Sequence, residues 1–257
     1  MTILTPASAR AYVESIELPV AKIMRGAREA QRREIDFDPL KTQAMVVGSE
    51  VVSFVRGISA ERRQDIINAA LFAQLAADHK VKDRNEVFAW YDVYFEVLGK
   101  IGWVIQDAGF NSYEEEADGL EAHEAILKVA AVALGPASTA LQLVTTTVEA
   151  MKSMDADNPW ITIFDRESRS AECARFQIAL AEEDAEGQFM VSTLAFALRA
   201  EASITQILFF KIRKSRMSFK NRTGRATINE DVLASVRESI KIKLAERIKD
   251  YVDAIEI

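Results

Sequence analysis

Cysteine and histidine are scarce in this sequence. Its 257 residues include one cysteine, Cys173, and two histidines, His79 and His123. A single cysteine cannot form an internal disulfide, so nothing in the sequence indicates an oxidising compartment. Glu-x-x-His and His-x-x-x-His spacings are absent, so no helix places two such metal ligands on one face. We therefore expect no metal site. We interpret Cys173 as an inert buried residue, with modification such as acylation as the alternative.

Glycine is also scarce, and the glycine motifs of common enzymes are missing. The 10 glycines form no GxGxxG, no GxxxxGK[ST] and no GxSxG pattern, so no phosphate-cradling loop or nucleophile elbow is indicated. The acidic run Glu114–Glu116 is typical of a solvated surface. We expect no catalytic residue and no cofactor, and hence a protein that is not an enzyme. A hydrolase or transferase with an unrecognised site is an alternative that rests on chain length alone.

The N-terminal sequence MTILTPASAR has no basic segment followed by a long apolar run. This argues against a cleaved secretion signal and favours folding in the cytoplasm, as for a bacterial cytosolic protein. Export by a route that needs no cleaved signal peptide is the alternative. The formal net charge of −7 disfavours nucleic acid as a partner, because phosphates would be repelled.

Hydrophobic periodicity predicts an α+β fold with an N-terminal helical bundle, a C-terminal antiparallel β-meander and a final packing helix. Residues 1–157 form the expected helical region. Residues 158–257 form the sheet and the last helix, and we expect both parts to share one core because no flexible linker separates them. The expected helices cover residues 7–34 with a break at Pro19, then 38–57, 59–77, 83–109, 121–134, 136–154 and 229–254.

Strict alternation of apolar residues indicates strands over residues 173–182, 188–200 and 203–213. A further alternation at Met217 and Phe219 runs into Asn221–Gly224, which reads as a hairpin turn before a returning strand at Arg225–Ile228. Together these predict four or five antiparallel strands with one face packed on helices.

Charged residues are missing from Val129–Val148. That length matches the roughly 20 residues that cross a ~30 Å hydrocarbon core. Threonines dilute the run, however, and Gly135-Pro136 interrupts it, so two shorter helices with a bend are expected. The simpler interpretation is a helical hairpin that stays buried in the core. The alternative is a concealed hairpin that enters a membrane. Its candidate residues are Val129, Val132, Leu134, Gly135, Pro136, Leu141, Leu143 and Val144.

A helical bundle with one concealed apolar hairpin resembles, in layout only, the helical pore-forming toxins of the cytolysin A type. The resemblance implies a form that stores the hairpin and then releases it into a bilayer. Release needs flexible hinges, and Asp118-Gly119 and Asp155–Asn158 are the candidates.

Basic residues concentrate in Lys211–Arg225, which contains no acidic residue. Such a segment could contact lipid phosphates or an acidic protein surface, or it could simply protect an exposed strand edge from pairing. A second basic cluster lies at Arg25–Arg33. The candidate anion- and headgroup-binding residues are Lys211, Arg213, Lys214, Arg216, Lys220, Arg222 and Arg225.

Two functional hypotheses follow. The first is a toxin-like or effector-like protein that engages an anionic membrane surface through the hairpin. The second is a cytosolic interaction or self-assembly module, whose acidic and basic patches pair between copies in a homo-oligomer or with an acidic protein partner.

Overall fold

A computed structural model gives the fold. It describes residues 4–20, 36–107, 109–112, 118–170, 172–183, 189–201, 207–208, 212, 217–245 and 247–255.

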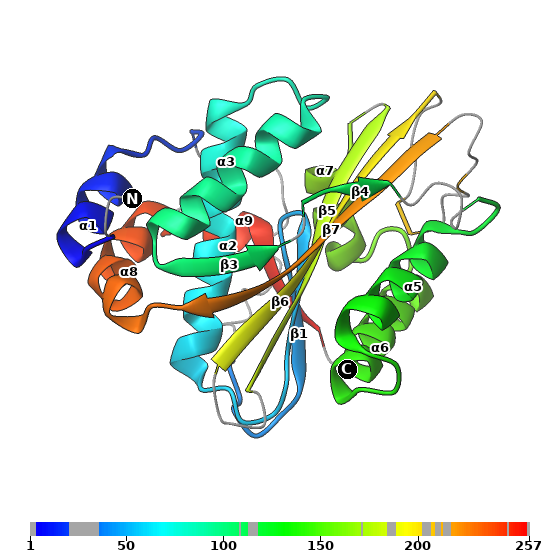
Figure 1. The fold of residues 1–257 in the computed structure, drawn as a ribbon, viewed down its shortest axis with the longest axis horizontal. Helices are drawn as coiled ribbons and strands as arrows, with labels where there is room; N and C mark the ends of the chain where they lie inside the picture. The colour runs from blue at the N-terminus through cyan, green and yellow to red at the C-terminus, as the bar shows by residue number, and fades with distance from the viewer. Residues whose placement is uncertain are drawn as a thin grey trace.

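One large mixed sheet organises the described chain (Figure 1). Its 8 strands follow the order β3-β7-β6-β5-β2-β1-β8, with β4 also paired to β7. The pairing of β2 with β5 is parallel, and the other strand pairs are antiparallel. The strands are β1 (Gln43–Val47), β2 (Glu50–Phe54), β3 (Trp103–Asp107), β4 (Asn111–Ser112), β5 (Cys173–Glu183), β6 (Phe189–Ala200), β7 (Met217–Ile228) and β8 (Val252–Ile255).

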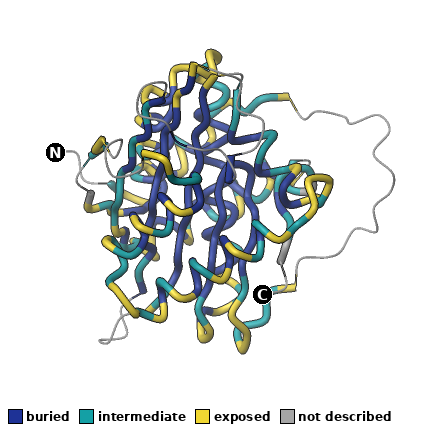
Figure 2. Tube along the Cα trace, turned by 90° about the vertical axis from the view of Figure 1, so that its right-hand side faces the viewer, coloured by how far each residue is buried: buried dark blue, intermediate teal, exposed yellow. Residues whose placement is uncertain are grey.

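Helices cover both faces of this sheet, so the α+β class is confirmed. One face packs on α1 (Pro6–Ser15), α2 (Ala60–Lys80), α3 (Val87–Lys100) and α8 (Glu230–Leu244). The other packs on α5 (Ala122–Leu134), α6 (Thr139–Ser153) and α7 (Pro159–Ser168). The short helix α9 (Ile248–Tyr251) leads into β8. Figure 2 shows the strands as the buried centre, with exposed residues at the loops and outer helix surfaces.

The two faces hold separate apolar cores. Phe54, Phe72 and Trp90 belong to the first core. The second contains a row of aromatic rings across three strands, in which Phe176 stacks on Phe196 at 5.0 Å and Phe196 on Phe219 at 5.6 Å between ring centroids. The central strands β1, β2, β5, β6 and β7 contribute residues to both cores, because successive side chains along a strand point to opposite faces.

Several predicted elements are confirmed. Ser59 caps α2 by accepting a hydrogen bond from the backbone N–H of Arg62, and Asn229 caps α8 in the same way through Val232. The strands predicted at 173–182 and 188–200 are β5 and β6. Two predicted helices extend too far. The helix predicted at 83–109 ends at Lys100 and is followed by the strand β3, and the helix predicted at 229–254 ends at Leu244, before α9 and β8.

The predicted N-terminal helical bundle is not what the structure contains, because residues 38–57 form the hairpin of β1 and β2. Both strands are buried on both faces, so their sequence is almost continuously apolar. Such a run contains apolar residues at helical spacing as well, which is why the sequence predicts a helix. Gly48 makes the turn with φ +56°. Strands from both sides of residue 157 therefore join one sheet.

The predicted turn at Asn221–Gly224 is also wrong. β7 runs without interruption from Met217 to Ile228 and pairs with β6 from Met217 to Ala226. Asn221 faces Phe196, and Gly224 faces Thr193. Pairing with β6 thus holds an asparagine and a glycine in extended geometry, although both residues favour turns. The predicted strand at 203–213 and the region 21–35 of the first helix lie largely or wholly outside the described residues.

Candidate functional site

The uncharged stretch folds as a helical hairpin, as predicted. α5 begins with a capping box formed by Glu121 and Glu124, and α6 begins with Ser138, whose hydroxyl accepts a hydrogen bond from the backbone N–H of Leu141 at 3.0 Å. Between the helices, Gly135 has φ +88° and Ala137 has φ +63°. The left-handed backbone at Gly135 is what ends α5, because glycine adopts it without steric cost.

The inner face of the hairpin packs on the aromatic row of the sheet. Val129 from α5 and Val144 and Val148 from α6 are buried in the same core as Phe176 and Phe196. The outer face is mostly polar, with Lys128, Gln142 and Glu149 exposed. Each helix is therefore amphipathic, with its apolar side held against β5 and β6.

Polar contacts between the hairpin and the rest of the protein concentrate at the open end of the hairpin. His123 Nδ1 lies 3.1 Å from the carbonyl oxygen of Leu208, and its Nε2 lies 3.0 Å from Lys152 Nζ. The Lys152 ammonium has only donors, so it donates to Nε2, and Nδ1 also lies 3.3 Å from Glu121 Oε2. This arrangement links the start of α5 to the end of α6 and to Leu208. We call it the His123 clasp.

Toward the turn, the hairpin is held almost entirely by apolar contacts. One polar contact lies midway along α6, where the hydroxyls of Thr147 and Ser53 are 3.3 Å apart. Hydrogen bonds in the turn around Gly135 stay within the hairpin among the described residues. Apolar packing has no directional preference, so it resists separation less specifically than a polar network.

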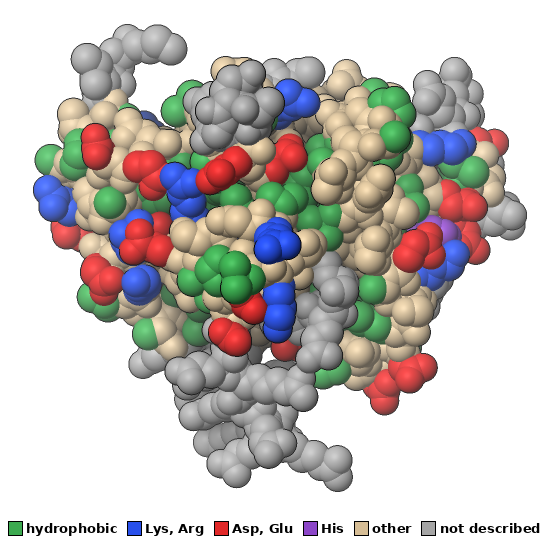
Figure 3. Space-filling view, turned by 90° about the horizontal axis from the view of Figure 1, so that it is seen from below, with side chains coloured by type: hydrophobic (Ala, Val, Ile, Leu, Met, Phe, Trp, Pro, Cys, Tyr) green, Lys and Arg blue, Asp and Glu red, His purple; other side chains and the backbone are tan. Residues whose placement is uncertain are grey.

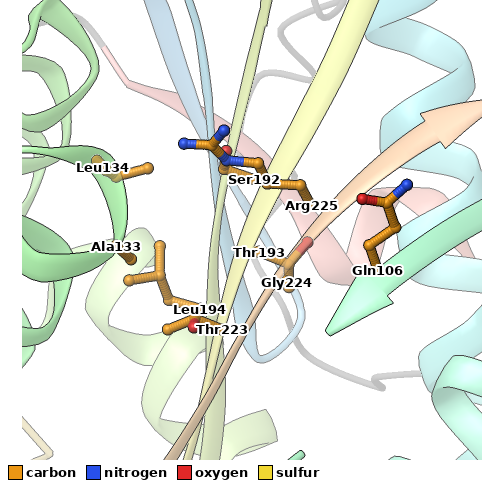
Figure 4. A pocket seen from close by; sticks show the side chains of 9 residues that line it. All are labelled: Gln106, Ala133, Leu134, Ser192, Thr193, Leu194, Thr223, Gly224 and Arg225. Atoms are coloured by element: carbon orange, nitrogen blue, oxygen red, sulfur yellow. The ribbon is translucent and has the colours of Figure 1, made fainter. Parts of the chain in front are cut away.

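A groove lies between the hairpin turn and the sheet, with a volume of about 330 Å³. In Figure 4, Ala133 and Leu134 form one side, Gln106 lies on the other, and Arg225 extends from β7 toward the α5 side. The remaining lining residues come from β6 and β7, and they are Ser192, Thr193, Leu194, Thr223 and Gly224.

Two polar groups of the groove have no partner among the residues that the structure describes. Arg225 is exposed and makes no ion pair or side-chain hydrogen bond with the residues that the structure describes. Its direct cross-strand neighbour Ser192 is 3% exposed. The Ser192 hydroxyl has no hydrogen-bond partner within the described chain. A buried hydroxyl left in this way normally costs free energy, so it calls for an explanation.

Comparisons with known proteins find no matching family model and no matching curated protein. Several solved structures are similar, among them the following three. A structure titled delta-endotoxin is 17% identical with a TM-score of 0.44, covering 79% of this chain and 91% of its own. The Evf virulence factor is 13% identical with a TM-score of 0.34, covering 84% and 85%. The activated Cyt2Ba monomer from Bacillus thuringiensis subsp. israelensis is 14% identical with a TM-score of 0.28, covering 50% and 71%. At these values the likenesses do not show membership of a family.

The predicted hairpin residues divide into three groups in the structure. Val129, Leu143 and Val144 are buried, whereas Leu134, Gly135 and Leu141 are half-buried near the turn. Pro136 is exposed, and Val132 is 86% exposed on the outer side of α5. No helix in the described part of the chain is long and apolar enough to cross a membrane.

The predicted basic residues also separate. Lys211, Arg213, Lys214 and Arg216 lie outside the described residues, as does the cluster at Arg25–Arg33. Lys220 and Arg222 lie over the rings of Phe88 and Phe95, at 5.2 and 4.1 Å from the ring centroids. Those rings come from α3, so these two cations lie on the sheet face opposite the hairpin. Of the described members, Arg225 alone lines the groove.

Sequence reasoning missed the groove's partner residues on β3 and β6. Ser192 and Leu194 share a strand face, and Thr223 and Arg225 share one on β7. Alternation on β6 was visible in the sequence, but the register that places Ser192 opposite Arg225 was not. Cys173 is 2% exposed, so any modification of its thiol requires local opening of the structure. Within the described residues, no three metal-ligating side chains gather.

Surface charge on the face drawn in Figure 3 does not form a single field. Figure 3 shows acidic and basic side chains interspersed on one face of the molecule, with apolar atoms between them. Attraction to an anionic surface would therefore depend on local cations more than on the net charge of −7.

Proposed function

We propose that this is a non-enzymatic, toxin-like or effector-like protein that engages an anionic membrane surface through the α5–α6 hairpin. One observation carries the proposal: apolar packing holds the turn end of the hairpin on the sheet, while the polar clasp lies at the opposite end. Opening from the turn would expose an apolar helix face and break few hydrogen bonds.

The contact we propose is interfacial. With 13 and 15 residues, α5 and α6 are about 20 and 22 Å long, which is shorter than a ~30 Å hydrocarbon core. Each keeps a polar outer face, and amphipathic helices of this kind lie in the plane of the interface. Val132 and Pro136 near the turn are exposed and would make first contact. Arg225 beside the turn supplies a cation for a lipid headgroup.

A reversible tether tests this proposal. The hydroxyls of Ser53 and Thr147 are 3.3 Å apart, so the double variant Ser53→Cys/Thr147→Cys places two thiols within reach of a disulfide. Oxidation would lock α6 to β2. We expect the oxidised variant to lose co-flotation with anionic vesicles and leakage of a trapped dye, and the reduced variant to recover both.

The single variant Thr147→Cys, treated with the same oxidant, controls for oxidation of Cys173. Equal leakage by the oxidised and reduced double variants would refute hairpin release. Absence of any vesicle binding by the natural chain, at low salt and at neutral or mildly acidic pH, would refute membrane engagement altogether.

The edge of the sheet supports the alternative function, self-assembly. β3 is a terminal strand in the described sheet, and its Val104 is 54% exposed. An edge strand with an exposed apolar residue can pair with a second copy. Light scattering should then show an oligomer whose size grows with protein concentration. The substitution Val104→Lys should convert that oligomer to monomers. A monomer at all concentrations would exclude this alternative.

A further inference from the structure

The groove beside the hairpin turn has the chemistry of a ligand site. We propose that it binds one lipid molecule, with the anionic headgroup on Arg225 and the acyl chain against Leu134 and Leu194. This inference rests on the proposed membrane function for its choice of a lipid as the source of the anion. It adds a defined site that a single lipid occupies while the hairpin is still docked.

The polar side of the groove selects an anion. Arg225 is the one charged residue among those that line it, and a guanidinium carries five N–H donors and no acceptor. The unpartnered hydroxyl of Ser192 lies on the neighbouring strand directly opposite. A phosphate or carboxylate oxygen accepts hydrogen bonds from guanidinium and hydroxyl groups, and such charge-assisted bonds are the stronger kind.

The apolar side of the groove favours a ligand with an acyl chain. Ala133 and Leu134 form one wall, and Leu194 forms part of the floor. A free phosphate ion would leave these surfaces uncovered and would meet a single cation. The volume of about 330 Å³ lies near the lower end of the range for small-molecule pockets, so it accommodates part of one lipid molecule.

Nucleic acid fits the groove less well. Single-stranded nucleic acid is held by several cations together with aromatic side chains on which the bases stack. The lining residues include no aromatic ring. Arg222 and its aromatic partners Phe95 and Phe110 lie on the opposite sheet face. The groove therefore pairs one cation with an aliphatic surface, which matches an amphiphile.

Isothermal titration calorimetry with decyl phosphate, below its micelle concentration, tests the site without vesicles. We expect saturable binding with one site per chain. Arg225→Gln should weaken binding about tenfold or more, because it removes a hydrogen-bonded charge pair. Leu134→Ala should weaken binding as well. Arg10→Gln is the matched control, since Arg10 is an exposed arginine on α1, which belongs to the other core. It should change affinity less than twofold.

Two further ligands separate the parts of the proposal. Inorganic phosphate should bind far more weakly than decyl phosphate, and decyl maltoside, which has a neutral headgroup, should also bind weakly. Binding of phosphate as tight as that of decyl phosphate would overturn the lipid assignment. Equal binding of decyl maltoside, or no effect of Arg225→Gln, would overturn the role of Arg225.

The tethered variant distinguishes this inference from the proposed function. Oxidised Ser53→Cys/Thr147→Cys should still bind decyl phosphate, because the tether lies midway along α6 and away from the groove lining. Vesicle leakage without decyl phosphate binding would refute the groove site alone. Decyl phosphate binding without vesicle engagement would refute the hairpin function alone.

Discussion

Replacing Glu50 with glutamine should make the protein more stable than the natural chain at alkaline pH and leave it nearly unchanged at pH 5. Glu50 lies on β2 and is 2% exposed. Tyr94 Oη donates a hydrogen bond to its Oε2 at 2.8 Å, and Gln74 Nε2 lies 3.4 Å from the same oxygen. Burial raises the pKa of Glu50 from 4.5 to about 7, although both hydrogen bonds lower the pKa in part.

The raised pKa fixes the direction of the pH dependence. Between about pH 4.5 and 7, the folded protein holds a proton on Glu50 that the unfolded chain has released. The stabilising contribution is complete below the unfolded pKa and disappears as the pH rises through the folded pKa. A difference of one in pKa corresponds to ~1.4 kcal/mol, so this residue accounts for a loss of about 2–3 kcal/mol between pH 5 and 9.

Urea unfolding of the natural chain and of Glu50→Gln at a series of pH values measures this loss of stability. Glutamine mimics the neutral carboxyl group and does not titrate, so the difference in free energy of unfolding should grow by about 2–3 kcal/mol from pH 5 to 9. Tyr94→Phe removes a donor to the ionised carboxylate, and should therefore shift the loss to higher pH. Parallel pH profiles for the natural chain and Glu50→Gln would refute a raised pKa at this residue.

Two further predictions concern the core beneath α2 and α3. Asp78 accepts hydrogen bonds from Arg175 and from Trp90 Nε1, and Arg175 stacks on the Trp90 ring at 4.3 Å. Asp78→Ala leaves the buried Arg175 charge unpaired and should lower the free energy of unfolding by about 3 kcal/mol, with a smaller loss for Asp78→Asn; equal losses would contradict a role for the charge. Gly48→Ala should cost about 1–3 kcal/mol, because the new Cβ would lie 2.5 Å from Gln74 Oε1 at a φ of +56°. Gly109→Ala has a similar φ of +76° in open space, so thermal unfolding should show a smaller loss for it than for Gly48→Ala.

The predicted elements that the structure confirms are those with local signals. Ser59 and Asn229 are N-cap residues that mark the starts of α2 and α8. Gly135-Pro136 divides the uncharged stretch into two helices. β5 and β6 show clear alternation. Each of these signals depends on residues a few positions apart, so no knowledge of the tertiary structure was needed.

The errors occur where distant partners decide the local structure. β1 and β2 are covered on both faces, which removes the alternation that identifies a strand. At Asn221–Gly224, pairing with β6 overrides the turn preference of the residues. The candidate site shows the same division. Leu134 and Arg225 were identified by composition, but their meeting around Ser192 depends on a strand register that spacing along the chain does not encode.

The parallel pairing of β2 with β5 affects how the chain folds. β5 begins more than 100 residues after β2 ends, and α5 and α6 lie in the intervening chain. The β1–β2 hairpin and the β5–β7 meander can each form early from nearby segments, whereas joining them requires closure of this long loop. Folding should therefore have a slow final phase, in which the two halves of the sheet dock through β2 and β5.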